Sequence, residues 1–202
     1  MSRKLKWIRV YCAMLMIGFS GCRSLTPSVT YYVMHAMDSG APVSANADGA
    51  VNVTIGIRTV ELPGVINRTQ MVKRTSSNQL EIASFYRWAD YPDRMVKRVL
   101  NENLQRIMAD ARVFSAPWTT GITPDVMLDF AFLELIGTTD GTMLLSTVWT
   151  QTTSGDPSTA QFHRTSLSAA INGSGFDDLA DAHNRVLEAL CREVAKSLDA
   201  KK

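Results

Sequence analysis

The first 21 residues constrain the rest of the chain more than any other segment. They contain four basic residues, Arg3, Lys4, Lys6 and Arg9, and no acidic residue. The uncharged run that follows, of roughly ten residues, is half of the ~20 that a bilayer-spanning helix needs. A charged start, a short apolar centre and small residues at the end are typical of a secretory signal peptide. We therefore expect residues 1–21 to be removed and the remaining chain to fold outside the cytoplasm.

The end of this leader resembles a bacterial lipobox. In Phe19-Ser20-Gly21-Cys22, an apolar residue and two small ones precede a cysteine. The thiol would accept a diacylglyceryl group at the membrane surface, and the small residues would let a peptidase cut just before it. We predict that Cys22 is lipidated and carries three acyl chains, palmitate among them, which hold a protein far more firmly than one chain does. An ordinary signal peptide cut elsewhere, or an uncleaved leader, stays as an alternative.

The use of cysteine agrees with lipidation. Cys12 would leave with the leader and Cys22 would be acylated, so that Cys191 alone remains and no internal disulfide can form. Cys191 falls within an apolar pattern of helical period, which favours a buried and unreactive thiol over a nucleophile.

The charge of the chain changes once the leader is removed. Of the 21 lysine and arginine residues, 17 remain without the four in the leader, against 19 aspartate and glutamate residues. A nucleic-acid-binding domain normally carries a basic stripe, so we expect no nucleic-acid partner. Apolar residues make up 46% of the chain, which is enough to build the core of one domain.

The residue after Cys22 predicts the location of the anchor. The familiar signal for retention at the inner membrane is aspartate at this position, and this chain has Arg23. We therefore expect the periplasmic face of the outer membrane. Residues 22–30 form a short tether before the domain at 31–202, and the eight steps from Cys22 to Thr30 reach at most ~28 Å. The domain must lie close to its membrane.

Apolar periodicity predicts an α+β domain with a largely antiparallel or mixed sheet and two helices packed on it. A helix capped by Asp90, with Pro92 in its first turn, should end near Ala111, and a last helix should run from Asp177 or Asp178 to about Leu198. A polar loop is expected at 38–50. Strands are expected at 31–34, 51–62, 70–74, 80–88, 126–136, 142–152 and 161–171.

The sequence offers little for catalysis. No two of the three histidines, His35, His163 and His183, have a spacing typical of metal ligands, and no G-x-S-x-G nucleophile motif occurs. His183 lies on the apolar side of the last helix, which favours a structural role. Carboxylates such as Asp129 are expected to be solvated. We therefore predict no catalytic residue, no metal and no cofactor.

Four segments together resemble the ABC-type transport auxiliary lipoproteins. They are the strand at 31–34 (YYVM), the stretch at 60–74 (VELPGVINRTQMVKR), the stretch at 80–89 (LEIASFYRWA) and the helical segment at 99–104 (VLNENL), all after the lipobox. Each motif is weak alone and the combination is specific. The resemblance covers about 22–108, and the rest of the chain agrees in layout.

The resemblance implies a role in transport rather than a reaction. Lipoproteins of this family accompany MCE-type (mammalian-cell-entry) lipid transport systems, in which an inner-membrane part supplies lipids to a periplasmic tunnel. The implied partner is an MCE-domain periplasmic protein, which the lipoprotein would dock to the outer membrane. A homo-oligomeric ring would suit a collar around such a tunnel.

Two segments are candidates for the partner interface. The loop at 62–66 would expose apolar residues between strands, or it would be buried as a compact loop. Trp88 would anchor a partner together with Arg87, since both residue types are enriched in interface hot spots, or it would close the core. The candidate residues are Leu62, Pro63, Val65, Ile66, Arg87 and Trp88.

Two other functions use the same anchor. A small envelope hydrolase or ligand-binding lipoprotein would need a deep polar pocket at His35, His163 or His183. An assembly or stability factor for another surface machine would need only an exposed binding surface.

Overall fold

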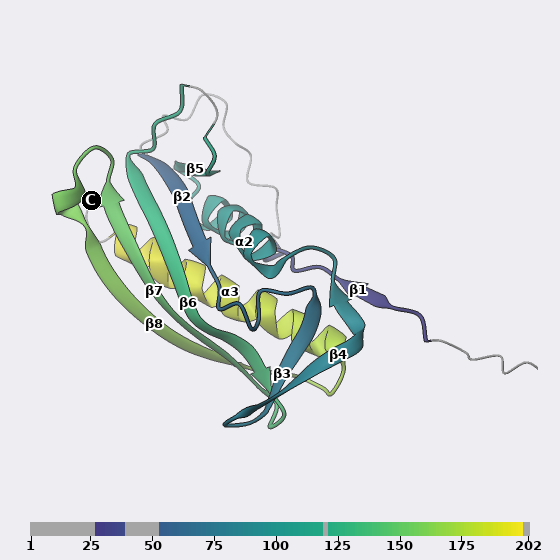
Figure 1. The fold of residues 1–202 in the computed structure, drawn as a ribbon. Coiled ribbons are helices and arrows are strands. Elements are labelled where there is room, and N and C mark those ends of the chain that lie inside the picture. Colours follow the sequence, from purple (N-terminus) through teal and green to yellow (C-terminus); the bar gives the residue numbers. More distant parts are fainter. Residues whose placement is uncertain (1–26, 39–52, 119–120, 200–202) are drawn as a thin grey trace, which may run out of the picture.

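The computed structural model describes residues 27–38, 53–118 and 121–199. The predicted signal peptide, Cys22 and most of the predicted loop at 38–50 lie outside these residues. The described chain forms one domain in which two long helices pack on an eight-stranded sheet (Figure 1). The elements are β1 Thr30–Tyr32, β2 Val53–Glu61, β3 Gln70–Ser76, β4 Gln79–Trp88, α2 Pro92–Ile107, β5 Ala111–Ser115, β6 Val126–Thr138, β7 Thr142–Thr153, the 3-10 helix η1 Pro157–Thr159, β8 Gln161–Ala170 and α3 Phe176–Asp199.

The sheet branches at β6. β2 pairs in parallel with the first half of β6, β3 pairs in parallel with its end, and β7 runs antiparallel along its whole length. β5 continues the sheet beyond β2, β4 and β1 continue it beyond β3, and β8 continues it beyond β7. Four of the seven pairings are parallel and three are antiparallel, so the α+β fold is confirmed with a mixed sheet. "Largely antiparallel" was too strong, because α2 crosses over and returns the chain parallel to β2.

The core lies between the sheet and the helices. β6 and β7 alternate between buried and exposed side chains, as a sheet covered on one face requires. A bulge between Phe132 and Glu134 shifts the alternation of β6, so that Leu135 is again buried. Full burial of such a side chain stabilises the fold by roughly 1.5–3 kcal/mol. The large apolar side chains of the two strands that are at most 2% exposed are Leu128, Phe130, Met143, Leu145 and Trp149.

Helix α2 begins at Pro92, within the predicted segment 90–93, but its capping residue and its end differ from the prediction. Its N-cap is Tyr91, which makes no side-chain capping bond, and the Asp90 carboxylate accepts a hydrogen bond from the backbone N–H of Tyr91 instead. Pro92 occupies the first turn as predicted. The helix ends at Ile107 rather than near Ala111, because the five residues after the turn form β5 beside β2. A strand this short has too few alternating residues to be predicted from the sequence.

Helix α3 runs behind the sheet and packs against α2, β7 and β8 (Figure 1). The predicted apolar stripe is confirmed, since Leu179, Val186, Leu190 and Val194 are all at most 1% exposed. Cys191 lies on the same buried face, as expected, and its thiol points at the Leu100 carbonyl of α2 at 3.9 Å. Neither helix of the described residues is long and apolar enough to cross a membrane.

Candidate functional site

The loop at 62–66 folds back onto the domain. The backbone N–H of Ile66 donates to the Pro63 carbonyl at 2.9 Å, which closes a tight turn. Ile66 is buried and Leu62 and Pro63 are half-buried, whereas Val65 remains 48% exposed. Of the four predicted interface residues in the loop, Val65 is therefore the one most open to a partner.

Leu62 and Ile66 come together with Trp88 around one small cavity. Its volume is about 10 Å³, room for a single water molecule at most. Its lining is Met34, Leu62, Ile66, Val72, Trp88, Pro92, Leu135 and His183. Residues that the sequence singled out separately thus form one packed cluster, which we call the Trp88 cluster and which consists of these eight residues.

Trp88 closes the core, one of the two roles that the sequence left open. It is 4% exposed, and its ring meets that of His183 edge-on at 5.0 Å. The ring nitrogen Nδ1 of His183 lies 2.8 Å from the Leu179 carbonyl. Burial lowers the pKa of His183 to about 4, and the hydrogen bond to Leu179 offsets only part of this effect. His183 is therefore neutral at physiological pH and Nδ1 donates to Leu179.

Arg87 lies on the other side of strand β4 from Trp88 and is half-buried. It is paired in the sheet with Tyr31 on one side and Gln70 on the other. Its Nε is buried and has no hydrogen-bond partner. An unpaired buried donor is costly in a folded protein, and neither sequence motif nor packing explains its presence here.

The other histidines lie in separate surroundings. His35 is exposed and sits 3.9 Å from the Asp181 carboxylate, while the ring of His163 stacks on Trp149 at 4.0 Å. Burial raises the pKa of the Cys191 thiol far above its ordinary value, which leaves the thiol protonated. Within the residues that the structure describes, no group of histidine, cysteine and carboxylate side chains is arranged to hold a metal ion.

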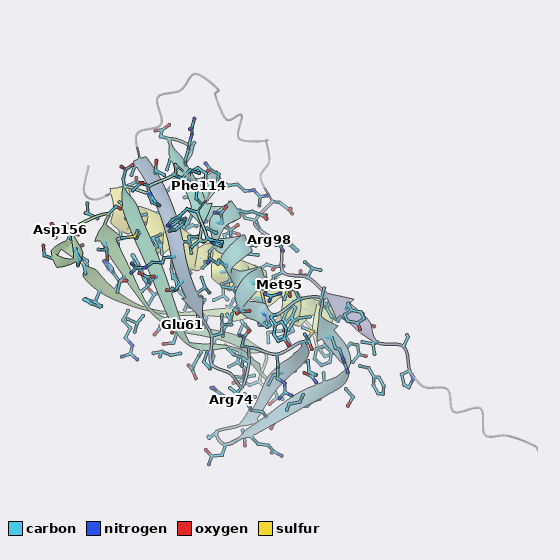
Figure 2. The ribbon with its side chains drawn as sticks, turned by 45° about the horizontal axis from the view of Figure 1, so that its top comes forward. Glu61, Arg74, Met95, Arg98, Phe114 and Asp156 are labelled. Atoms are coloured by element: carbon cyan, nitrogen blue, oxygen red, sulfur yellow. The ribbon has the colours of Figure 1, made fainter. Side chains whose placement is uncertain are left out.

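A larger hollow lies at the other end of the molecule. Its volume is about 420 Å³, and β2, β6, β7, β8 and the turn around η1 contribute to it. Phe162 stands at its rim with 76% of its surface exposed, the largest exposure among the bulky apolar side chains. Figure 2 shows Asp156, another lining residue, at the end opposite to β1. Threonines form much of the remaining wall.

A partly exposed ion pair borders this hollow. The Arg58 guanidinium and the Asp129 carboxylate are 2.6 Å apart, and the Thr59 hydroxyl donates to the same carboxylate at 2.7 Å. Burial alone would raise the pKa of Asp129, but the hydrogen bonds from Arg58 and Thr59 outweigh it and lower that pKa. The sequence suggested that Asp129 is solvated. In the structure it is ionised and bound by Arg58 and Thr59.

Sequence reasoning missed this hollow, although a signal was present. Period-two alternation in β8 puts Phe162 on the same face as Arg164 and Ser166, both exposed. One exposed phenylalanine is not unusual by itself, but a phenylalanine at the rim of a hollow is a candidate contact residue. Phe162 and the hollow are thus a candidate binding surface on a domain of the α+β class.

Comparison with known protein families shows to which family the chain belongs. The model of the ABC-type transport auxiliary lipoprotein component matches residues 32–195, most of the chain. The protein belongs to this family, as the sequence motifs implied. The comparison with curated proteins returned no match.

Two solved structures share the fold. One, described only as an uncharacterized protein, is 19% identical with a TM-score of 0.70, and the match covers 85% of this chain and 99% of that one. The other, from Xanthomonas campestris and of the DUF330 family, is 12% identical with a TM-score of 0.68, over 86% of this chain and 100% of that one. At these identities the likeness concerns the fold alone.

Proposed function

We propose that this protein is a non-enzymatic outer-membrane lipoprotein of an MCE-type ABC intermembrane lipid transport system. It docks the periplasmic MCE tunnel to the outer membrane. The observation that carries the proposal is the family match over residues 32–195. The lipobox at Cys22 and the arginine that follows it, Arg23, support the location.

The short tether supports a docking role. From Cys22 to the first residue of β1 the chain reaches at most ~28 Å, about the thickness of one small domain. A partner that binds this domain is therefore held near the lipid surface. A ring of several copies would surround the end of a tunnel, and mass photometry of the detergent-solubilised protein measures the number of copies.

The surroundings of the histidines favour docking over hydrolysis. A hydrolase of this size needs a deep polar pocket beside its general base. The cavity at His183 has room for one water molecule at most, and the histidine itself is neutral because its pKa is lowered to about 4. His35 is an exposed surface residue. The family description as a transport auxiliary component agrees with docking.

The hollow beside Phe162 is the better candidate for the docking surface. It lies at the end away from β1, the described strand nearest in sequence to the proposed anchor, and so would face a partner that approaches across the periplasm (Figures 1 and 2). An exposed phenylalanine beside a hollow of about 420 Å³ could pack against a protein partner, while the hollow receives an apolar side chain of that partner. Val65, on the loop predicted from the sequence, is the competing position.

Affinity capture of the full-length, tagged protein from detergent-solubilised membranes tests the function. We expect an MCE-domain protein among the captured proteins. Phe162→Asp should reduce its recovery by about tenfold or more, the effect of losing at least ~1.4 kcal/mol at a binding hot spot. Val65→Asp should have a smaller effect.

Ser166→Asp is the matched control, since it adds the same charge to the same exposed face of β8 away from the hollow. It should leave recovery unchanged. Repeated captures without any MCE-domain protein would contradict the proposed function, and equal losses with F162D and S166D would contradict the proposed docking surface.

A further inference from the structure

The bulky apolar side chains that the fold leaves exposed gather at one end of the molecule. Ten such residues are exposed in the described chain, and six of them lie on β1 and its flanks, on the end of β4, or just before α2. These six, which we call the β1 patch, are Val29, Tyr31, Val33, Phe85, Tyr86 and Tyr91. Scattered exposed apolar residues need no explanation, but a concentration at one end marks an interaction surface.

Backbone contacts hold the β1 patch together. β1 pairs in parallel with the end of β4, and Thr30 lies opposite Tyr86 in that ladder. The backbone N–H of Ala89, two residues before Tyr91, donates to the Tyr32 carbonyl at 2.8 Å. The segment that leads to Tyr91 therefore lies against β1. Alternation along the strands puts Tyr31 and Phe85 on one face of this sheet edge and Tyr86 on the other, so the patch wraps around the edge formed by β1 and the end of β4.

Aromatic rings extend this surface toward α3. The rings of Tyr32 and Tyr86 are 6.3 Å apart, and Tyr86 stacks on Phe176 at 4.2 Å. The Lys73 ammonium lies 4.4 Å above the Phe176 ring. On the other flank, the Arg94 guanidinium lies 5.7 Å from the Tyr91 ring. Tyrosines with cations beside them are the side chains typical of a membrane–water interface.

The anchor identifies the occupant of the patch. β1 begins eight residues after Cys22, so that a lipidated Cys22 keeps β1 within ~28 Å of the bilayer. The β1 patch includes the first strand of the described chain, which is the described element nearest to Cys22 in sequence. A surface that is held there continuously meets lipid at high local concentration.

We propose that the β1 patch rests on the lipid surface, with Tyr31, Val33 and Tyr91 at the level of the phospholipid headgroups. This inference rests on the anchor that the proposed function includes. β1 is an edge strand, so its outer backbone groups need water or headgroups as hydrogen-bond partners, which limits the depth of contact. The domain would thereby be held in one orientation, with the hollow beside Phe162 turned away from the membrane.

The charges around the patch predict which lipids suffice. Acidic residues lie near these cations. Arg94 pairs with Asp90 at 3.4 Å. Burial, and to a smaller extent the nearby Asp177 carboxylate, raises the pKa of Tyr32. With both signs present, the patch has no reason to require anionic lipid. Contact should occur on phosphatidylcholine and should depend little on salt.

Site-directed fluorescence on the acylated full chain tests the proposal. Acylation occupies Cys22 and burial protects Cys191, so an introduced cysteine is the accessible thiol of the mature chain. Tyr31→Cys, Val33→Cys and Tyr91→Cys place a fluorescent label in the patch. Phe162→Cys is the matched control, because it replaces an even more exposed aromatic residue at the other end.

Each labelled protein is reconstituted in phosphatidylcholine vesicles with a nitroxide on the headgroups. We expect the nitroxide to quench the labels at 31, 33 and 91 several-fold more than the label at 162, and aqueous iodide to show the reverse order. Equal access of iodide to all four labels would overturn the proposal. Labels in the patch that are shielded from iodide yet unaffected by the nitroxide would also overturn it, because a second copy of the chain would then cover them.

Mass spectrometry of the same samples establishes acylation, and a chain without lipid on Cys22 would remove the basis of the proposal. Capture of an MCE-domain partner is measured separately. Loss of that capture with quenching intact contradicts the proposed function alone, whereas loss of quenching with capture intact contradicts the membrane contact alone.

Discussion

The two ends of this domain expose apolar side chains in different ways. At the β1 end, several aromatic and aliphatic residues from three segments are exposed around one sheet edge, and the nearby Trp88 cluster encloses only about 10 Å³. At the other end, Phe162 stands beside a hollow of about 420 Å³. A broad surface suits a fluid and uniform partner such as a bilayer, whereas a hollow with one prominent ring suits the shaped surface of a protein.

The ends also differ in how they are held together. The β1 end is stabilised by buried aromatic packing between Trp88 and His183, away from water. The hollow is bordered by the ion pair of Arg58 with Asp129, in which the Arg58 side chain is 49% exposed. Buried packing contributes far more to stability than a partly exposed ion pair does. Substitutions at the two ends should therefore differ in size and in pH dependence.

The largest effect should come from the anchor itself. Cys22→Ala removes the acylated thiol, and we expect the protein to leave the membrane fraction almost completely, because the acyl chains supply nearly all the membrane affinity. Fractionation of cell envelopes with immunodetection measures this. Cys12→Ala, within the predicted leader, should leave the distribution unchanged. Membrane association of C22A equal to that of the unmodified chain would show that something other than lipid holds the protein.

A second contrast concerns one aromatic residue at each end, the buried Trp88 and the exposed Phe162. Trp88→Ala should lower the free energy of unfolding by about 3–5 kcal/mol, the cost of emptying a large buried site. Phe162→Ala should change it by no more than about 0.5 kcal/mol, since its side chain is already in water. Urea unfolding followed by circular dichroism provides both values. Similar values for the two variants would break the distinction between a packed end and a docking end.

Acid should weaken the Trp88 end first. The folded-state pKa of His183 is about 4, below its ordinary 6.5, so the unfolded chain binds the proton more tightly. Stability should therefore fall as the pH drops from about 6.5 toward 4, by up to about 3 kcal/mol at ~1.36 kcal/mol for each pKa unit. Asp129, whose pKa is lowered from 3.8, loses its contribution only in stronger acid.

Unfolding curves at several pH values separate these two groups. His183→Gln should flatten the slope between pH 6.5 and 4, whatever its effect on overall stability. His35→Gln is the control, because that histidine is exposed and should leave the slope in place. An unchanged slope in H183Q would assign the acid sensitivity to other groups.

The smallest effect should come from the ion pair beside the hollow. Arg58→Ala should lower the free energy of unfolding by about 1 kcal/mol or less, because half of the arginine side chain is already in contact with water. High salt should reduce the difference between R58A and the unmodified chain further. A loss as large as that in W88A would mean that the two ends are stabilised to a similar extent after all.

Local patterns predicted the elements well where the pattern was long. The stripe of Leu179, Val186, Leu190 and Val194 located α3 and its buried face, and the alternation of β6 and β7 located the central hairpin. The predictions were wrong where few residues carried the signal. β5 has five residues, and the predicted cap of α2 depended on one contact that Asp90 does not make.

The predicted interface shows the same limit for function. Leu62, Ile66 and Trp88 were each singled out from the sequence, and the fold packs them in one cluster with His183, with Ile66 and Trp88 buried and Leu62 half-buried. A residue type favoured in interfaces is equally suited to a core, so composition alone does not separate the two roles. Phe162 was open to prediction from alternation, but the hollow beside it also needs Arg58 of β2, which lies about a hundred residues earlier in the sequence.

The sequence by itself determined the long helices and strands, though not β5, and, through the motifs between 31 and 104, the family to which the chain belongs. Both follow from local order, because periodicity and motif spacing are properties of neighbouring residues. Only the tertiary structure decided that the sheet is mixed, that Trp88 is internal, and that exposed apolar residues gather around β1 while Phe162 stands apart. Those outcomes depend on which strand pairs with which and on what covers each side chain, and the pairing joins segments that lie far apart along the chain.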